Sequence, residues 1–196
     1  MIGQPMEPIT DTDGEHYQTV KIGEQIWMAE NLRRTTFECV DGVQVKLGDG
    51  IERGPGVRFY DGTPRYAYYK NAPEKGFGVL YNYSVVEKCQ LCPLGYRMPS
   101  KADWESLVDA LGGESLAGHL LLKKGTSGFM TELGGRIDSY GSVLGGSYSY
   151  WWSSDYMPTL IGERVEVYAF RISYKGIVNI NGEDIRIGNY IRCIKE

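Results

Sequence analysis

The sequence contains very little histidine, no long apolar run and no excess of basic charge. Only 2 of its 196 residues are His, so the side chain most used for acid–base catalysis near neutral pH is scarce. No stretch of about 18 apolar residues occurs, so no segment is predicted to cross a membrane as a helix. Lys and Arg number 21 against 25 Asp and Glu, and they are scattered along the chain. We therefore expect no nucleic-acid partner.

The start of the chain lacks the features of a secretion signal. Residues 1–10 have neither a basic n-region nor an apolar h-region, so either the protein has no signal peptide or its leader has been removed. If a leader has been removed, a lipid anchor could also lie upstream of the given sequence. We expect residues 1–10 to form a disordered or leader-proximal tail, and residues 11–196 to form a single domain.

Motifs of phosphate-binding loops and nucleophile elbows are absent. The glycines of residues 41–65 fit neither G-x-G-x-x-G nor the P-loop, and no G-x-S-x-G occurs. His16 and His119 stand alone, and no acid is spaced to orient either ring. Four carboxylates could pair in space, although nothing in their spacing predicts it: Glu30, Glu105, Glu132 and Asp138. We expect a protein that is not an enzyme and that uses no cofactor.

The four cysteines are Cys39, Cys89, Cys92 and Cys193. An even count fits one or two disulfides in an oxidising compartment, and four cysteines allow three connectivities. The spacing of Cys89 and Cys92 is that of a redox dithiol, but Pro93 follows where a helix N-terminus is needed to lower a thiol pKa. A zinc site would need further ligands at matching spacing, which the sequence lacks. Disulfides are favoured, with their pairing open.

The N-terminal half is predicted to be rich in β-structure. Two β-prone runs, residues 16–22 and 26–32, flank a Gly-containing turn and predict a hairpin. Asp11 and Asp13 precede Gly14 as at the start of a calcium loop, but the later ligands are missing, so we expect a turn without a metal. Residues 66–69 and 79–86 are aromatic and β-branched, which predicts two further strands.

Two helices are predicted in the middle of the chain. The first begins at Ser100, a good N-cap, and Asp103 can return the capping bond. Its apolar residues fall at i, i+3, i+4 and i+7, which is one buried stripe: Trp104, Leu107, Val108 and Leu111. Two glycines at residues 112–113 end it. A shorter helix is predicted over residues 114–124, where His119 is expected to be solvated or capped.

From residue 125 onward the pattern predicts strands throughout. They cover residues 150–154, 163–174, 176–180 and 189–194, and Asn181-Gly182 is typical of a hairpin turn. Adjacent residues of a strand point to opposite faces, so one of Trp151 and Trp152 could line a site. We nevertheless expect all four tryptophans in the core, with Trp27 and Trp104 completing the set. No repeat or linker divides the chain, which indicates one α+β domain.

The chain resembles the Fibrobacter succinogenes major paralogous domain family over residues 11–195. The segments that carry the resemblance are Asp11-Thr-Asp-Gly14, Val20-Lys-Ile-Gly23, Trp27-Met-Ala-Glu-Asn-Leu32, Tyr66-Ala-Tyr-Tyr69, Leu80-Tyr-Asn82, Cys92-Pro-Leu-Gly-Tyr-Arg-Met-Pro-Ser100, Asp103-Trp104, Gly134-Gly135-Arg136, Tyr150-Trp-Trp-Ser-Ser154 and Ile191-Arg-Cys193. The family is similar to the C-type-lectin-like fold that formylglycine-generating enzymes also use. The resemblance implies an α+β, C-type-lectin-like fold with two helices, small antiparallel β-sheets and long loops.

The resemblance also implies a location and a cysteine pairing. Family members look like secreted or lipid-anchored bacterial surface proteins; if Met1 is the native start, a virion or the cytoplasm is the alternative location. The family's recurrent cysteines match Cys92 and Cys193, which would join the helical half to the last strand. Cys39 and Cys89 would then be left as a second pair or as two free thiols. Tyr96 stands where the family commonly has Trp.

In lectin-like domains the irregular segment before the final strand presents the ligand surface. Tyr and Asn give such surfaces rigid area and adaptable hydrogen bonds. The candidate ligand-contacting residues here are Trp152, Asp155, Tyr156, Arg164, Glu166, Tyr168, Tyr174, Asn179, Asn181, Asp184, Asn189 and Tyr190. The sugar-binding triplets of calcium-dependent C-type lectins are absent, so a calcium-dependent sugar site is not predicted.

These features predict an extracellular, non-enzymatic recognition module for a glycan or protein ligand that the sequence does not identify. One alternative is a structural or adhesive subunit of a surface assembly, which an exposed β edge or a large apolar patch would favour. Another is a variable protein of a diversity-generating retroelement of phage origin. The last is an oxidase like the formylglycine-generating enzymes, but its cysteine pair would lie in the C-terminal half, where Cys193 stands alone.

Overall fold

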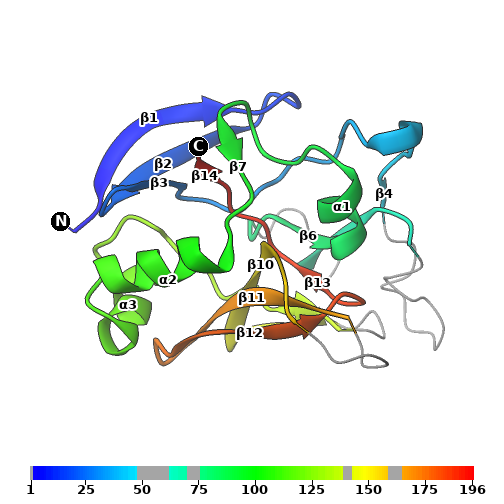
Figure 1. The fold of residues 1–196 in the computed structure, drawn as a ribbon. Coiled ribbons are helices and arrows are strands. Elements are labelled where there is room, and N and C mark those ends of the chain that lie inside the picture. Colours follow the sequence, from blue (N-terminus) through cyan, green and yellow to red (C-terminus); the bar gives the residue numbers. More distant parts are fainter. Residues whose placement is uncertain (1, 48–61, 70–75, 139–142, 159–164) are drawn as a thin grey trace.

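The computed structural model describes residues 2–47, 62–69, 76–138, 143–158 and 165–196 (Figure 1). Three α-helices occur in this part of the chain: α1 (Tyr83–Lys88), α2 (Lys101–Ala110) and α3 (Glu114–Leu121), with a 3₁₀ turn, η1, at Val40–Gly42. The strands form small sheets that are almost entirely antiparallel, with one parallel pair. The described chain therefore has the mixed content of an α+β protein, with one α-helix more than expected.

The first sheet has the order β1-β2-β3-β14-β7 and joins the two ends of the chain. Its strands are β1 (Gln4–Thr10), β2 (His16–Ile22), β3 (Gln25–Met28), β7 (Tyr96–Arg97) and β14 (Ile194–Lys195). The expected hairpin is confirmed as β2 and β3, which pair from Ile22 with Gln25 to Thr19 with Met28. The predicted disordered tail is wrong for Gln4–Thr10, because these residues pair with β2 along its length.

The second sheet has the order β4-β5-β6-β13-β8-β9. Its strands are β4 (Lys46–Leu47), β5 (Arg65–Tyr68), β6 (Val79–Asn82), β8 (Arg136–Ile137), β9 (Val143–Leu144) and β13 (Gly188–Asn189). The single strand predicted over residues 79–86 is wrong in its second half, where Asn82 becomes the residue before helix α1. Asn82 has extended φ and ψ as the N-cap of α1, and its side-chain amide bonds the backbone of Arg65 and Thr63.

The third sheet has the order β10-β11-β12, with β10 at Tyr148–Tyr156, β11 at Glu166–Ser173 and β12 at Val178–Asp184. The hairpin turn predicted at Asn181-Gly182 is wrong. Both residues lie inside β12, opposite Ala169 and Tyr168. The turn lies earlier because Gly176 adopts φ +73°, and its N–H donates to the Ser173 carbonyl at 2.9 Å.

Helices α2 and α3 follow the sequence prediction closely. The Ser100 side chain accepts from the N–H of Asp103 at 3.1 Å, and the Asp103 carboxylate accepts from the N–H of Ser100 at 2.7 Å, so the capping box is confirmed. Gly112 and Gly113 follow α2 with φ near +90°, a conformation that glycine adopts without a Cβ clash. Figure 1 shows α2 and α3 together at one side of the molecule, next to the third sheet.

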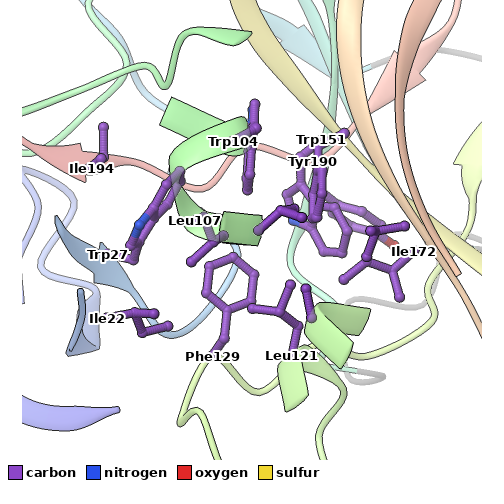
Figure 2. Packing of buried hydrophobic residues seen from close by; sticks show 14 of the residues in the cluster. Ile22, Trp27, Trp104, Leu107, Leu121, Phe129, Trp151, Ile172, Tyr190 and Ile194 are labelled. Atoms are coloured by element: carbon purple, nitrogen blue, oxygen red, sulfur yellow. The ribbon is translucent and has the colours of Figure 1, made fainter. Parts of the chain in front are cut away.

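The main core combines buried side chains from all three sheets with those of helices α2 and α3 (Figure 2). Trp104 stacks on Phe170 with ring centroids 4.5 Å apart and lies 4.6 Å from Trp27. All four tryptophans are fully buried, as expected. Trp151 belongs to this core, whereas Trp152 belongs to a second cluster on the other side of β10. The prediction that Trp151 and Trp152 point to opposite faces of their strand is therefore confirmed.

Two disulfides complete the fold. Cys92 is bonded to Cys193, as the family resemblance implies, and Cys39 is bonded to Cys89. The first bond closes a sequence separation of 101 residues and ties the segment before β7 to the segment before β14. None of the helices in the described ranges is long and apolar enough to cross a membrane.

Candidate functional site

The third sheet carries many of the predicted ligand-contacting residues, but its two faces separate them. Asn179 and Asn181 pair with Arg171 and Ala169 and share the face of Trp152. Glu166, Tyr168 and Asp184 alternate with them and lie on the opposite face, which α2 covers in part. The sheet therefore does not present the predicted residues as one surface.

Three of the predicted surface residues are core residues, so their assignment to a ligand surface is wrong. Trp152, Asn189 and Tyr190 have no exposed surface. The Trp152 indole donates from Nε1 to the Tyr81 carbonyl at 2.8 Å, and the Tyr190 hydroxyl donates to the Gly134 carbonyl at 3.1 Å. The polar parts of these two rings thus hold neighbouring backbone in place.

Other predicted residues have structural partners at the start of α2 or in α1. The Asp155 carboxylate accepts from the N–H of Lys101 at 2.6 Å, where the negative charge stabilises the helix N-terminus. Tyr168 lies under the Lys101 ammonium, with 5.4 Å between Nζ and the ring centroid. Tyr156, about half exposed, donates to the Glu87 carboxylate. The contacts of Asp155 and Tyr168 position α2 on the sheet, whereas the Tyr156 contact joins β10 to α1.

The remaining predicted residues are scattered. Tyr174 is 59% exposed in the turn between β11 and β12. Asp184 accepts from the side chain and the N–H of Arg186, at 2.8 and 2.9 Å. Arg164 lies outside the described residues.

One hollow does contain predicted residues, namely Asn179 and Asn181. It is a groove of about 560 Å³ between α2 and β12, lined as well by Lys101, Glu105, Val108, Asp109, Glu114, Val178 and Ile180. Val108 and Val178 are buried and form part of an apolar floor. In the described chain β12 is an edge of its sheet, and four consecutive residues of this strand, 178–181, line the groove. We call this hollow the α2–β12 groove.

The rim of the α2–β12 groove is acidic. Glu105, Asp109 and Glu114 are exposed, and one cation, Lys101, accompanies them. Lys101 and Glu105 form an ion pair one helical turn apart. The groove lining thus has a formal charge of −2, and the carboxylates of Asp109 and Glu114 face solvent. This arrangement attracts cationic groups at low to moderate salt.

A second hollow, a cavity of about 190 Å³, was not predicted from the sequence. Its lining includes Glu30, Asn31, Phe77, Glu132 and Arg192. Arg192 is only 1% exposed. Its Nε and Nη2 donate to Asn31 Oδ1 at 3.1 and 2.8 Å, and its Nη1 donates to the carbonyl of Phe129. We call this hollow the Arg192 cavity.

Burial determines the electrostatics of the Arg192 cavity. It lowers the pKa of Arg192 to about 9, because the charged form loses hydration, while Glu30 and Glu132 act in the opposite direction. The guanidinium therefore stays charged at neutral pH. Asn31 Oδ1 also accepts from Trp151 Nε1 at 2.7 Å, so one amide oxygen serves three donors.

Two features of the sequence point to Asn31 and Arg192, although not to their contact. Asn31 lies in the segment Trp27-Met-Ala-Glu-Asn-Leu32 and Arg192 in Ile191-Arg-Cys193, both of which carry the family resemblance. Arg192 is also the one charged residue in a run of buried positions from 187 to 194. Their separation of 161 residues gives no indication that the two side chains meet.

The described residues hold no group of three or more His, Cys, Asp or Glu suited to a metal. Asp11 forms a turn, as predicted, because its Oδ1 accepts from the N–H groups of Asp13 and Glu15 at 2.9 and 3.0 Å. All four cysteines are in disulfides, and Cys89 and Cys92 have different partners. This pairing excludes a redox dithiol formed by Cys89 and Cys92, and it leaves no thiol to bind zinc.

The carboxylates considered for acid–base chemistry do not gather in one place. Glu30 and Glu132 line the Arg192 cavity, whereas Glu105 lines the α2–β12 groove. Glu30 accepts from Arg33 at 2.6 Å, and Glu132 is paired with Lys123. Asp138 lines neither hollow. Each carboxylate of the Arg192 cavity thus already has a cationic partner.

Comparison with known proteins identifies the family. The sequence model of the Fibrobacter succinogenes major domain matches residues 20–195, which is almost the whole chain. Neither curated proteins nor solved structures give a match. The matched region contains both hollows and both disulfides. The chain therefore belongs to the Fibrobacter succinogenes major domain family.

Proposed function

We propose that the protein is a non-enzymatic recognition module that acts outside the cell or at its surface and holds a partner in the α2–β12 groove. The observation that carries the proposal is the open edge of β12 beside an apolar floor and an acidic rim. An exposed strand edge offers unpaired backbone groups to another chain. A groove between such an edge and a helix can take an extended peptide as an added strand.

The lining of the α2–β12 groove favours one kind of partner, an extended protein segment with positive charge. The formal charge of −2 complements Lys or Arg side chains, and Val108, Val178 and Ile180 suit apolar side chains between them. None of the described residues that line this groove is aromatic, so they offer a sugar ring no flat surface on which to stack. A glycan is therefore the less favoured ligand.

The proposed scaffold is C-type-lectin-like, as the family resemblance implies. Two features support it: the sheet that joins both chain ends, and the Cys92–Cys193 bond near the last strand. Two disulfides also favour an oxidising location, since thiols are kept reduced in the cytosol. The non-enzymatic role is supported because no free cysteine is left for oxidase chemistry of the formylglycine-generating kind.

The test is binding to an array of nine-residue extended peptides of graded net charge, with a glycan array in parallel. We expect binding to cationic peptides that contain alternating apolar residues, and we expect binding to weaken as salt rises. Asp109→Lys should reduce this binding. The matched control Glu24→Lys, which changes a carboxylate 95% exposed in its side chain and outside the groove lining, should not. Binding to glycans alone, or equal loss in both variants, would contradict the proposal.

A further inference from the structure

Within the part of the chain that the structure describes, no carboxylate contacts the guanidinium of the Arg192 cavity. Its hydrogen-bond acceptors in the described chain are the Asn31 amide oxygen and the Phe129 carbonyl, both uncharged. The guanidinium also lies over Phe129, with 4.2 Å between Cζ and the ring centroid. Buried charges in proteins are normally paired, because an unpaired ion loses its hydration without compensation. Glu30 and Glu132 line the same cavity and favour the charged form of Arg192, but among the described residues neither is in hydrogen-bond contact with it.

The hydrogen-bonding capacity of Arg192 is also incomplete. A guanidinium has five N–H donors. Three contacts account for Nε–H, one N–H of Nη1 and one of Nη2. One N–H on each terminal nitrogen is left without an acceptor among the described residues, and a guanidinium can bind the two oxygens of a carboxylate with one N–H from each terminal nitrogen.

The two carboxylates that line the Arg192 cavity, Glu30 and Glu132, already have other partners. Glu30 accepts from the N–H of Gln18 at 3.0 Å and from Arg33 at 2.6 Å, and Glu132 is paired with Lys123. The cavity lining has three cations and two carboxylates, which leaves a formal charge of +1. Glu15 also contacts Arg33 from outside the lining, but it is 46% exposed in its side chain and water screens its charge. One added negative charge would neutralise the lining.

The walls of the cavity suit a small organic group beside that charge. Phe77 and Met130 contribute apolar surface to it. Met130 has φ +54°, the one positive φ of a non-glycine residue in the described ranges. It follows Phe129, whose carbonyl accepts a hydrogen bond from Arg192. Such a conformation is unfavourable for an L-residue and persists only where surrounding contacts impose it. The volume of about 190 Å³ admits a carboxylate with a few further atoms.

We propose that the Arg192 cavity binds the carboxylate group of a small ligand, with the Arg192 guanidinium as its counter-ion. A peptide C-terminus and an acidic sugar both carry this group. The cavity shares no lining residue with the α2–β12 groove, so this site stands or falls independently of the function proposed above.

The direct test follows the Nε–H signal of Arg192 by ¹H–¹⁵N NMR in the intact, disulfide-bonded protein. Its contacts with the Phe129 ring identify the signal without any variant. Acetate is the probe, and acetamide, which has the same shape without the charge, is the control. We expect a saturable shift with acetate only. No shift with acetate, or equal shifts with both probes, would overturn the proposal.

Two rim substitutions test the sign of the electrostatics without touching Arg192. Lys123→Gln removes a cation 61% exposed in its side chain and should weaken acetate binding by roughly two- to fivefold. Glu132→Gln removes a repelling carboxylate and should strengthen binding by a similar factor. Lys175→Gln, in the exposed β11–β12 turn, is the control and should change nothing. Effects of the opposite sign would contradict the proposal.

Two further probes distinguish the sources of the carboxylate. N-acetylglycine represents a peptide C-terminus, and glucuronate represents an acidic sugar. Tighter binding of N-acetylglycine assigns a peptide C-terminus as the source, and tighter binding of glucuronate assigns an acidic sugar. Either result supports a carboxylate site. If neither produces the shift that acetate produces, the cavity does not accept a carboxylate on a larger molecule and the proposal fails.

Discussion

Replacing Asn31 with Ala should destabilise the protein strongly, because one amide oxygen serves three buried donors. Oδ1 of Asn31 accepts from Trp151 Nε1 at 2.7 Å and from two nitrogens of Arg192 at 2.8 and 3.1 Å. An unsatisfied buried donor costs about 1 to 3 kcal/mol, and one on a charged group costs more. These terms are not independent, so we expect a loss of about 3 to 5 kcal/mol.

Urea unfolding of the oxidised protein, followed by tryptophan fluorescence and far-ultraviolet circular dichroism, measures this loss. It is a large share of the roughly 5 to 15 kcal/mol typical of a folded domain. Asn31→Asp keeps an acceptor for both partners and should lose less than Asn31→Ala. It should also abolish acetate binding, because its own carboxylate neutralises Arg192. Asn179→Ala, in the α2–β12 groove, is the control and should change stability by no more than about 0.5 kcal/mol.

The result that would refute this reasoning is a loss below about 1 kcal/mol for Asn31→Ala with an unchanged denaturant slope. Arg192 would then be satisfied without Asn31, and the guanidinium would not need the acceptor that the structure assigns to it.

Three further predictions concern stability. Changing Cys92 and Cys193 together to Ser should cost about 4 to 5 kcal/mol in urea unfolding, because the bond closes a loop of 101 residues. Gly118→Ala should lower the melting temperature, since its added Cβ would lie 1.9 Å from a backbone carbonyl of the β11–β12 turn. Burial raises the pKa of Asp103, but the bond from Arg97 and those from the helix cap outweigh burial and lower it below its ordinary value. The stability it contributes is present above the unfolded pKa and is lost as pH falls through the folded pKa, so Asp103→Asn should flatten the stability profile between roughly pH 5 and pH 2.

Local signals in the sequence were enough for some elements. Helix α2 carries its own N-cap, its own apolar stripe and two terminal glycines, all within residues 100–113, so no distant contact is needed to specify it. The β2–β3 hairpin and the burial of the four tryptophans follow from the same kind of local pattern. The pairing of Cys92 with Cys193 was predicted from the family resemblance, because the spacing of the cysteines alone leaves three connectivities open.

Other elements depend on contacts that local patterns do not contain. Residues 83–86 are β-prone, yet they belong to helix α1, in which Tyr83 is buried against the distant Trp152 ring. Asn181-Gly182 is typical of a turn, but Gly176 makes the reversal five residues before Asn181. The Arg192 cavity combines side chains from opposite ends of the chain, so only the fold brings them together.

The addition of a partner segment to the edge of β12 can be observed by hydrogen–deuterium exchange of the protein, alone and with the tightest peptide from the array. We predict slower exchange in β12, at Val178–Asp184, with little change in β1 at the edge of the first sheet. Slower exchange confined to other elements, with β12 unchanged, would contradict the account.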